Sequence, residues 1–290
     1  MDFKTGNELL KLCRETGLPV SAVMKNREMD CGALSEKEIN EKLEKVLSIM
    51  KQAVRESLEN PRASIGGLIG GEARKVADFG RTPASFCGSL INKAAAYSMG
   101  VLEVNASMGL IVAAPTAGSS GVLPGVLTAL QEERGLSDET LYAGLLNASA
   151  VGYLFMRNAS VSGAEAGCQA EIGAASAMSA AAVVEMMGGT PEMSLQAASL
   201  AISNLLGLVC DPIAGLVESP CQSRNSIGAV NALICAELAL CGVTHPVPFD
   251  EMADAMYRVG KSIPFELRET ALGGCAATPS GCALQCRVRS

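Results

Sequence analysis

Three cysteines, Cys168, Cys210 and Cys221, are the residues of this sequence whose type and setting best suit chemistry. Each stands beside glycine, proline or a polar residue at the edge of an apolar, helix-like stretch, so we expect all three in loops or at helix ends. Thiolates are soft ligands, which select iron–sulfur clusters, zinc or copper(I). A structural zinc site usually takes four ligands in close Cys-x-x-Cys pairs, and the sequence has no such pair. The pattern therefore favours an iron–sulfur cluster.

The alternative for any isolated cysteine is a small, buried, apolar residue. We assign that role to Cys13, Cys87, Cys235 and Cys241. The single histidine, His245, stands in a proline-rich turn (THPVP) and is interpreted as a solvated turn residue rather than as a ligand.

A second chemical feature is the turn 116–121 (TAGSSG), which is rich in glycine and hydroxyl groups and directly precedes an apolar stretch. Backbone N–H groups at such a helix start bind carboxylates or phosphates, although many turns of this kind only cap their helix. Three cysteines on a four-iron cluster leave one iron free, and a free iron acts as a Lewis acid toward a hydroxyl group. Together, these features predict the dehydration of a small hydroxy acid.

The elements that must position these residues are predicted to be helices, because apolar residues recur every three or four positions and strict alternation is rare. Hydrophobic residues make up 49% of the chain but aromatic residues only 3%, so small side chains must fill the helix crossings. We predict an all-α fold, a compact multi-helix catalytic domain with small-residue helix packing. Helices are expected over residues 35–60, 85–102, 138–156, 171–187 and 195–209, with Cys210 at the end of the last and Cys221 at the start of the next.

Three regions are expected along the chain: an N-terminal helical arm (1–60), a helical iron–sulfur catalytic domain (61–274) and a cysteine-rich C-terminal tail (275–290). In the arm, Ser35 and Glu38 form the pattern of a capping box, which predicts a helix start. We expect the tail to be disordered.

The net charge of −7 and the absence of a basic block argue against nucleic acid and anionic membranes as partners. The longest uncharged run, 104–131, contains Pro115 and Pro124, so it is predicted to be helix, loop and helix rather than a membrane span. The chain begins with polar residues and shows no secretory signal. Eleven cysteines then indicate a reducing cytoplasm, where they are thiols or metal ligands.

Several segments resemble the bacterial iron–sulfur L-serine dehydratases, and most closely the α-subunit of the two-subunit type. They are SGAEAGCQAEIG (162–173), LGLVCDPIAGLVESPCQSRN (206–225) and AAPTAGSSG (113–121). The segment ETALGGCAATPSG (269–281) is similar to the C-terminal signature of that family. The resemblance covers roughly residues 60–280.

The resemblance implies an all-helical catalytic domain with a [4Fe-4S] cluster bound by Cys168, Cys210 and Cys221. It implies L-serine as the substrate, converted into pyruvate and ammonia without pyridoxal phosphate, with the free iron acting on the serine hydroxyl. The residues that would lie near the substrate are Asn105, Thr116, Gly118, Ser119, Ser120 and Gly121.

The catalytic base is not assigned by the sequence. Single-chain relatives carry an additional domain with a Ser-Ser-His-Thr motif whose histidine is a candidate base, and this chain has no such motif. The resemblance therefore implies a separate β-subunit that can supply the base. Glu165 is a fallback candidate, with a capping or hydrogen-bonding role as its alternative. In some relatives a C-terminal cysteine reaches the open iron, and Cys282 and Cys286 are the candidates here, whereas Cys275 has no assigned role.

Two other functions remain open on the sequence. One is an iron–sulfur redox sensor or electron carrier, which would show no serine turnover. The other is a pyridoxal-phosphate dehydratase, in which the turn 116–121 holds the phosphate and a lysine such as Lys93 forms the Schiff base. That cofactor is usually bound by folds of alternating strands and helices, which the sequence does not show.

Overall fold

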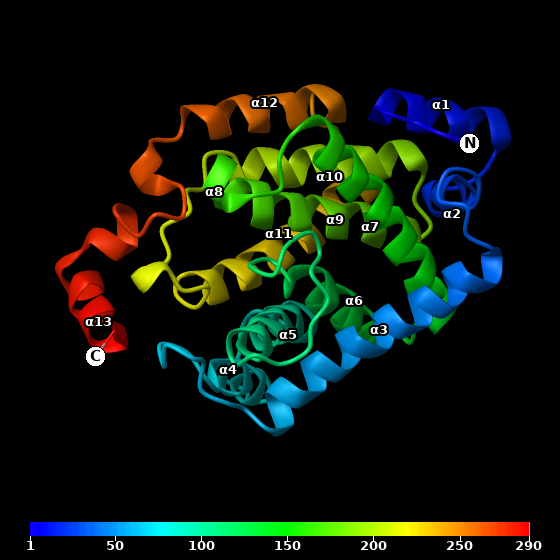
Figure 1. Cartoon of the computed structure of the whole chain (residues 1–290). Coiled ribbons are helices and arrows are strands. Elements are labelled where there is room, and N and C mark those ends of the chain that lie inside the picture. Colours follow the sequence, from blue (N-terminus) through cyan, green and yellow to red (C-terminus); the bar gives the residue numbers. More distant parts are fainter. Residues whose placement is uncertain (290) are drawn as a thin grey trace.

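The computed structural model describes residues 1–289, and these residues form a helical protein (Figure 1). The α-helices are α1 (Gly6–Thr16), α2 (Val20–Asp30), α3 (Glu36–Glu59), α4 (Glu72–Gly80), α5 (Ser89–Ala106), α6 (Val122–Arg134), α7 (Asp138–Asn158), α8 (Gly163–Ala166), α9 (Ala174–Met186), α10 (Pro191–Leu205), α11 (Cys221–Leu240), α12 (Phe249–Ser262) and α13 (Pro279–Arg289). A π-helical turn, η1 (Gln169–Gly173), leads into α9, and three short 3-10 turns are η2 (Ile213–Gly215), η3 (Phe265–Leu267) and η4 (Gly274–Ala277). Among the described residues there is no strand, so the predicted all-α fold is confirmed.

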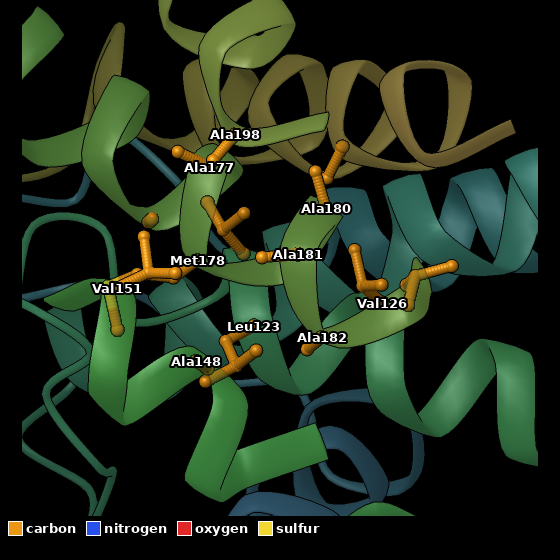
Figure 2. Close-up of a cluster of buried hydrophobic side chains, with 14 of the residues drawn as sticks. Leu123, Val126, Ala148, Val151, Ala177, Met178, Ala180, Ala181, Ala182 and Ala198 are labelled. Atoms are coloured by element: carbon orange, nitrogen blue, oxygen red, sulfur yellow. The ribbon is translucent and has the colours of Figure 1, made fainter. Parts of the chain in front are cut away.

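Helix α9 lies at the centre of the core because its side chains are small on every face. Its residues are buried throughout, with the partial exception of Glu185. It packs most extensively against α7 and α10, and then against α11. Figure 2 shows the alanines of α9 meeting Leu123 of α6, Val151 of α7 and Ala198 of α10. Alanine ridges allow neighbouring helices to approach closely, which is the small-residue packing that the composition predicts.

The crossing of α5 and α6 depends on two glycines. A Cβ atom on Gly121 would lie 1.9 Å from the carbonyl oxygen of Ser98, and one on Gly125 would lie 2.7 Å from the backbone nitrogen of Ser98. Only glycine allows this approach of two backbones. The turn 116–121, which leads into α6, is therefore pressed against α5.

The long helix α3 begins where the sequence predicts it. The N–H of Glu38 donates to Ser35 Oγ (3.3 Å), and the N–H of Ser35 donates to Glu38 Oε2 (2.8 Å), so the capping box is confirmed. Ile39, Leu47 and Met50 of this helix belong to the same buried cluster as the side chains of α5, α6 and α7. The division of the chain at residue 60 stays a prediction.

Two local predictions are wrong. Helix α10 ends at Leu205 rather than near Cys210, because Leu206 is extended and Gly207 has a left-handed φ of 86°. Cys210 therefore lies beyond the helix in an extended segment. The C-terminal tail is not disordered over the described residues, since it forms η4 and α13, and α13 packs against η2.

Candidate functional site

The three cysteines come together in one buried site, although they belong to separate segments. Cys168 precedes η1, Cys210 lies in the extended segment after α10, and Cys221 is the first residue of α11. They are 3%, 3% and 7% exposed, and none forms a disulfide. The pKa of Cys210 is raised first by burial and then by Cys168, so these thiols are close enough to influence one another.

Gln169 holds Cys168 beside the segment that carries Cys210. The N–H of Gln169 donates to the carbonyl oxygen of Leu208 (2.9 Å), and its Oε1 accepts from the N–H of Gly207 (2.8 Å). Gln169 is only 1% exposed, so these hydrogen bonds do not compete with water. The backbone and side chain of one buried residue, Gln169, therefore hold the two cysteine segments together.

Cys210 is held from its other side by the segment after η3. The N–H of Cys210 donates to the carbonyl oxygen of Leu267 (2.8 Å), and its carbonyl oxygen accepts from the N–H of Glu269 (2.7 Å). These bonds form an isolated parallel bridge centred on Arg268. Glu269 has a left-handed φ of 62°, so the chain turns sharply after this contact. The sequence contains no signal for so short a pairing.

Asn225 joins Cys221 to the turn 116–121. Its Nδ2 donates to the carbonyl oxygens of Cys221 (2.9 Å) and Gly118 (2.8 Å), and its Oδ1 accepts from the N–H of Gly121 (3.0 Å). Asn225 is fully buried. One side chain therefore fixes a predicted ligand against the predicted anion-binding turn. Because Cys221 opens α11, its thiol also lies at the positive end of the helix dipole.

Within the turn, most polar groups are already engaged. The N–H of Thr116 donates to Ser119 Oγ (3.4 Å), and the N–H of Ser120 donates to the carbonyl oxygen of Ala117 (3.3 Å). Asn105 Nδ2 reaches the same oxygen of Ala117 at 3.4 Å. The hydroxyl of Ser120, by contrast, is fully buried and has no hydrogen-bond partner in the described part of the chain. It is a hydroxyl of the turn that is available to a ligand.

Glu171, which the sequence analysis does not single out, lies between the cysteines and the turn. Its Oε1 accepts from Thr116 Oγ1 (2.7 Å), and its Oε2 is 4.0 Å from Cys210 Sγ. Burial raises the pKa of this carboxyl, and the hydrogen bond from Thr116 only partly opposes the rise. Glu171 belongs to the π-helical turn η1, and such turns often mark functional sites. The π geometry is not visible in the sequence, which is why Glu171 was missed.

Arg224 brings a positive charge next to the thiols. Its Nη2 is 2.7 Å from Asp211 Oδ1, and its Nη1 donates to the carbonyl oxygen of Val209 (2.8 Å). Burial raises the pKa of Cys168 to about 12, with Glu171 adding to the rise and Arg224 opposing it. Burial also raises the pKa of Cys221. At neutral pH these thiols keep their protons unless a cation takes their place.

Two other candidates from the sequence are engaged elsewhere. Glu165 Oε1 is 2.5 Å from Lys261 Nζ and its Oε2 accepts from Ser160 Oγ (2.7 Å), so both carboxylate oxygens have partners. Lys93 pairs with Glu132 (3.1 Å) and Glu133 (2.8 Å) near the C-terminal end of α6. The turn 116–121 lies at the other end of α6, about 15 Å away along the axis. Lys93 is therefore not the Schiff-base lysine of the pyridoxal-phosphate alternative.

The remaining cysteines fall into two groups. Cys13 and Cys235 are buried, as predicted, whereas Cys87 and Cys241 are exposed, so their predicted burial is wrong. Cys87 lies in the loop before α5, and Cys241 follows the last residue of α11, where neither position faces the core.

The tail cysteines Cys275, Cys282 and Cys286 are exposed. The N–H of Cys275 donates to Asp211 Oδ2 (2.6 Å), which connects the start of the tail to the site.

The described residues contain neither a candidate site for a single metal ion nor a candidate membrane-spanning helix. Within residues 1–289, no group of three or more His, Cys, Asp or Glu side chains has the geometry to hold a single metal ion. No described helix combines the length and the apolar character needed to cross a membrane.

The chain is similar over nearly all of its length to proteins of known name. The family described as Serine dehydratase alpha chain matches residues 15–276. The probable L-serine dehydratase alpha chain of Bacillus subtilis (strain 168) is 46% identical over 286 residues, which cover 99% of this chain and 95% of that protein. The L-serine dehydratase alpha chain of Peptoniphilus asaccharolyticus is 44% identical over 279 residues, or 96% of each chain. The L-serine dehydratase of Streptomyces coelicolor is 38% identical over 287 residues, which cover 97% of this chain but only 62% of that protein.

Proposed function

The chain belongs to the serine dehydratase alpha-chain family, and we propose that it is the subunit of an L-serine dehydratase that carries the cluster. The reaction converts L-serine into pyruvate and ammonia, by loss of water followed by hydrolysis of the resulting imine. The observation that carries the proposal is the junction at Asn225, whose buried amide binds the backbone of Cys221 and of the turn 116–121. A soft-metal ligand and an anion-binding turn are thereby held side by side.

The chemistry of the donor set fits a [4Fe-4S] cluster held by Cys168, Cys210 and Cys221. All three thiols are buried, and burial opposes their ionisation unless a cation is present. In a four-iron cluster each of the three cysteines would bind a separate iron. When bound by three cysteines, a cluster supplies a Lewis-acidic iron that makes a hydroxyl a better leaving group.

The turn 116–121 is proposed to hold the carboxylate of the substrate. It stands at the start of α6, where the helix dipole favours an anion, and the free hydroxyl of Ser120 is able to donate to it. Asn105 and the hydroxyls of Thr116 and Ser119 complete this side of the site. Orienting the substrate in this way aligns its hydroxyl and α-proton for elimination.

A β-subunit is the proposed partner and the proposed source of the base. Two relatives that this chain covers to 95% and 96% of their length are named alpha chains, and 38% of the Streptomyces coelicolor protein lies outside the match, which covers 62% of it. Glu165 is bound to Lys261 and Ser160 and is therefore a poor candidate for the base. The proposed location is a reducing cytoplasm, in which cysteines remain thiols or bind metal.

Iron and acid-labile sulfide, measured after anaerobic reconstitution, test this function together with a visible spectrum before and after L-serine. We expect about four of each per chain and a spectrum that L-serine perturbs. Cys210→Ala should lose both iron and turnover. Cys13→Ala is the matched control, because Cys13 is equally buried but lies in α1, and it should retain both. A cluster that does not respond to L-serine would instead support the redox sensor, and full turnover by Cys210→Ala would refute the cluster chemistry.

A further inference from the structure

Glu171, which is partly buried, has fewer hydrogen-bond donors than the fully buried carboxylates Glu103, Glu218 and Asp211. Glu103 accepts from the N–H groups of Gly71 and Ala73 and from Gln222 Nε2. Glu171 receives one good hydrogen bond, from the hydroxyl of Thr116, besides a distant contact with a thiol.

The same contrast holds for the other two buried carboxylates. Glu218 accepts from Ser64 Oγ and from the N–H groups of Gly66 and Leu68. Asp211 is paired with Arg224. None of the ion pairs between described side chains includes Glu171. Glu171 is only partly buried, and its one good hydrogen bond leaves most acceptor positions of the carboxylate free for a donor that enters the site.

The backbone approaches the carboxylate of Glu171 closely at two glycines. A Cβ atom on Gly118 would lie 2.9 Å from its Oε1, and one on Gly163 would lie 2.5 Å from its Oε2. Glycine at both positions keeps side chains away from the carboxylate. The other neighbours of the carboxylate are Thr116 of the turn 116–121 on one side and Cys210 on the other.

We propose that Glu171 binds the α-ammonium group of the amino-acid substrate, an assignment that rests on the proposed function. An ammonium group has three N–H donors and a positive charge, which is what Glu171 lacks. Its position between Thr116 and Cys210 places the ammonium between the carboxylate-binding turn and the thiols. Glu171 then selects amino acids over acids that have no amino group.

Calorimetric titration of the reconstituted complex with its partner subunit tests this role, using two ligands that cannot lose water. L-alanine has the ammonium and carboxylate groups of serine, and propanoate has only the carboxylate. The wild type should bind L-alanine roughly 10- to 100-fold more tightly than propanoate, the value of a charge-assisted hydrogen bond. Glu171→Gln should remove most of this preference and leave propanoate affinity within about threefold.

Three controls separate this role from a structural one. Glu165→Gln, a carboxylate already paired with Lys261, should keep the wild-type preference. Glu171→Asp keeps the charge and should retain part of the preference, which a folding defect would not do. Iron and sulfide content should be unchanged in Glu171→Gln.

The outcomes distinguish the two proposals. A wild type that turns over L-serine but does not prefer L-alanine to propanoate overturns the assignment of Glu171 alone. The assignment also fails if Glu171→Gln weakens both ligands equally, or if it loses its iron. A wild type that neither holds a cluster nor turns over L-serine overturns the proposed function itself.

Discussion

The loss of one partner from the pair Arg224–Asp211 is expected to be among the most destabilising single changes in the cluster-free chain. The two side chains are 16% and 4% exposed, and Nη2 lies 2.7 Å from Oδ1. Arg224 also binds the carbonyl oxygen of Val209, and Asp211 accepts from the N–H of Cys275. The pair therefore joins the Cys210 segment, the start of α11 and the C-terminal tail.

Replacing Arg224 by methionine keeps most of the aliphatic volume but leaves Asp211 as an uncompensated buried charge. Removing one partner of a buried pair costs about 3–5 kcal/mol. Because Arg224 is partly exposed, we expect a loss at the lower end of this range, about 3 kcal/mol in the free energy of unfolding. The matched control is Arg258→Met, whose pair with Asp254 is 72% and 57% exposed and should cost about 0–1 kcal/mol.

Urea unfolding of the iron-free chain, followed by far-ultraviolet circular dichroism, measures both variants. Asp211→Asn, combined with Arg224→Met, provides a double-mutant cycle. Each single change leaves a lone buried charge, whereas the double change leaves none, so the double variant should be more stable than the two separate losses predict. Additive losses, or a loss for Arg224→Met no larger than for Arg258→Met, would refute the reasoning.

Two further perturbations test space and protonation. Gly163→Ala places a Cβ atom 2.5 Å from Glu171 Oε2, so it should lower the free energy of unfolding by about 1–3 kcal/mol and reduce bound iron. Gly173→Ala is the control, because its Cβ atom would lie 3.5 Å from the nearest atom, Cδ1 of Ile202, and it should do neither. Burial raises the pKa of Cys13 from 9.0 to about 11, so the unfolded chain releases this proton first. The free energy of unfolding therefore falls as pH rises between these values, by up to about 3 kcal/mol. Urea unfolding measured across this pH range should show a shallower decline in the free energy of unfolding for Cys13→Ala than for the wild type. Cys31→Ala, at an exposed cysteine, should behave as the wild type. Parallel pH curves for all three proteins would show that Cys13 does not cause the decline.

The helical framework could be predicted because its signals are local. The capping box of Ser35 and Glu38 fixes the start of α3, and proline followed by a periodic apolar stretch fixes the start of α11 at Cys221. The end of α10 was misplaced because the apolar period continues through Val209, whereas the left-handed Gly207 ends the helix earlier. The spacing of apolar residues predicts which face of a helix is buried, but it does not predict the residue at which the helix ends.

The site was only partly predictable because its assembly is non-local. Cysteine type and setting predict three candidate ligands, but the hydrogen bonds that position their segments come from Gln169, Asn225 and the bridge at Arg268. Glu171 was missed because its importance arises from a π-helical turn and from the absence of a cation beside it, and neither is a property of residue type or spacing.

The charges of the site favour the binding of positively charged groups. Burial raises the pKa of Cys168, Cys210 and Cys221 and of Glu171, so burial opposes negative charge on these groups in the empty site. Arg224 cannot compensate all of them, because its guanidinium is already paired with Asp211. A cationic cluster core would displace the thiol protons, and a substrate ammonium would stabilise the carboxylate of Glu171. Cofactor and substrate would then complete the same buried charge balance, each at the acidic groups nearest to it.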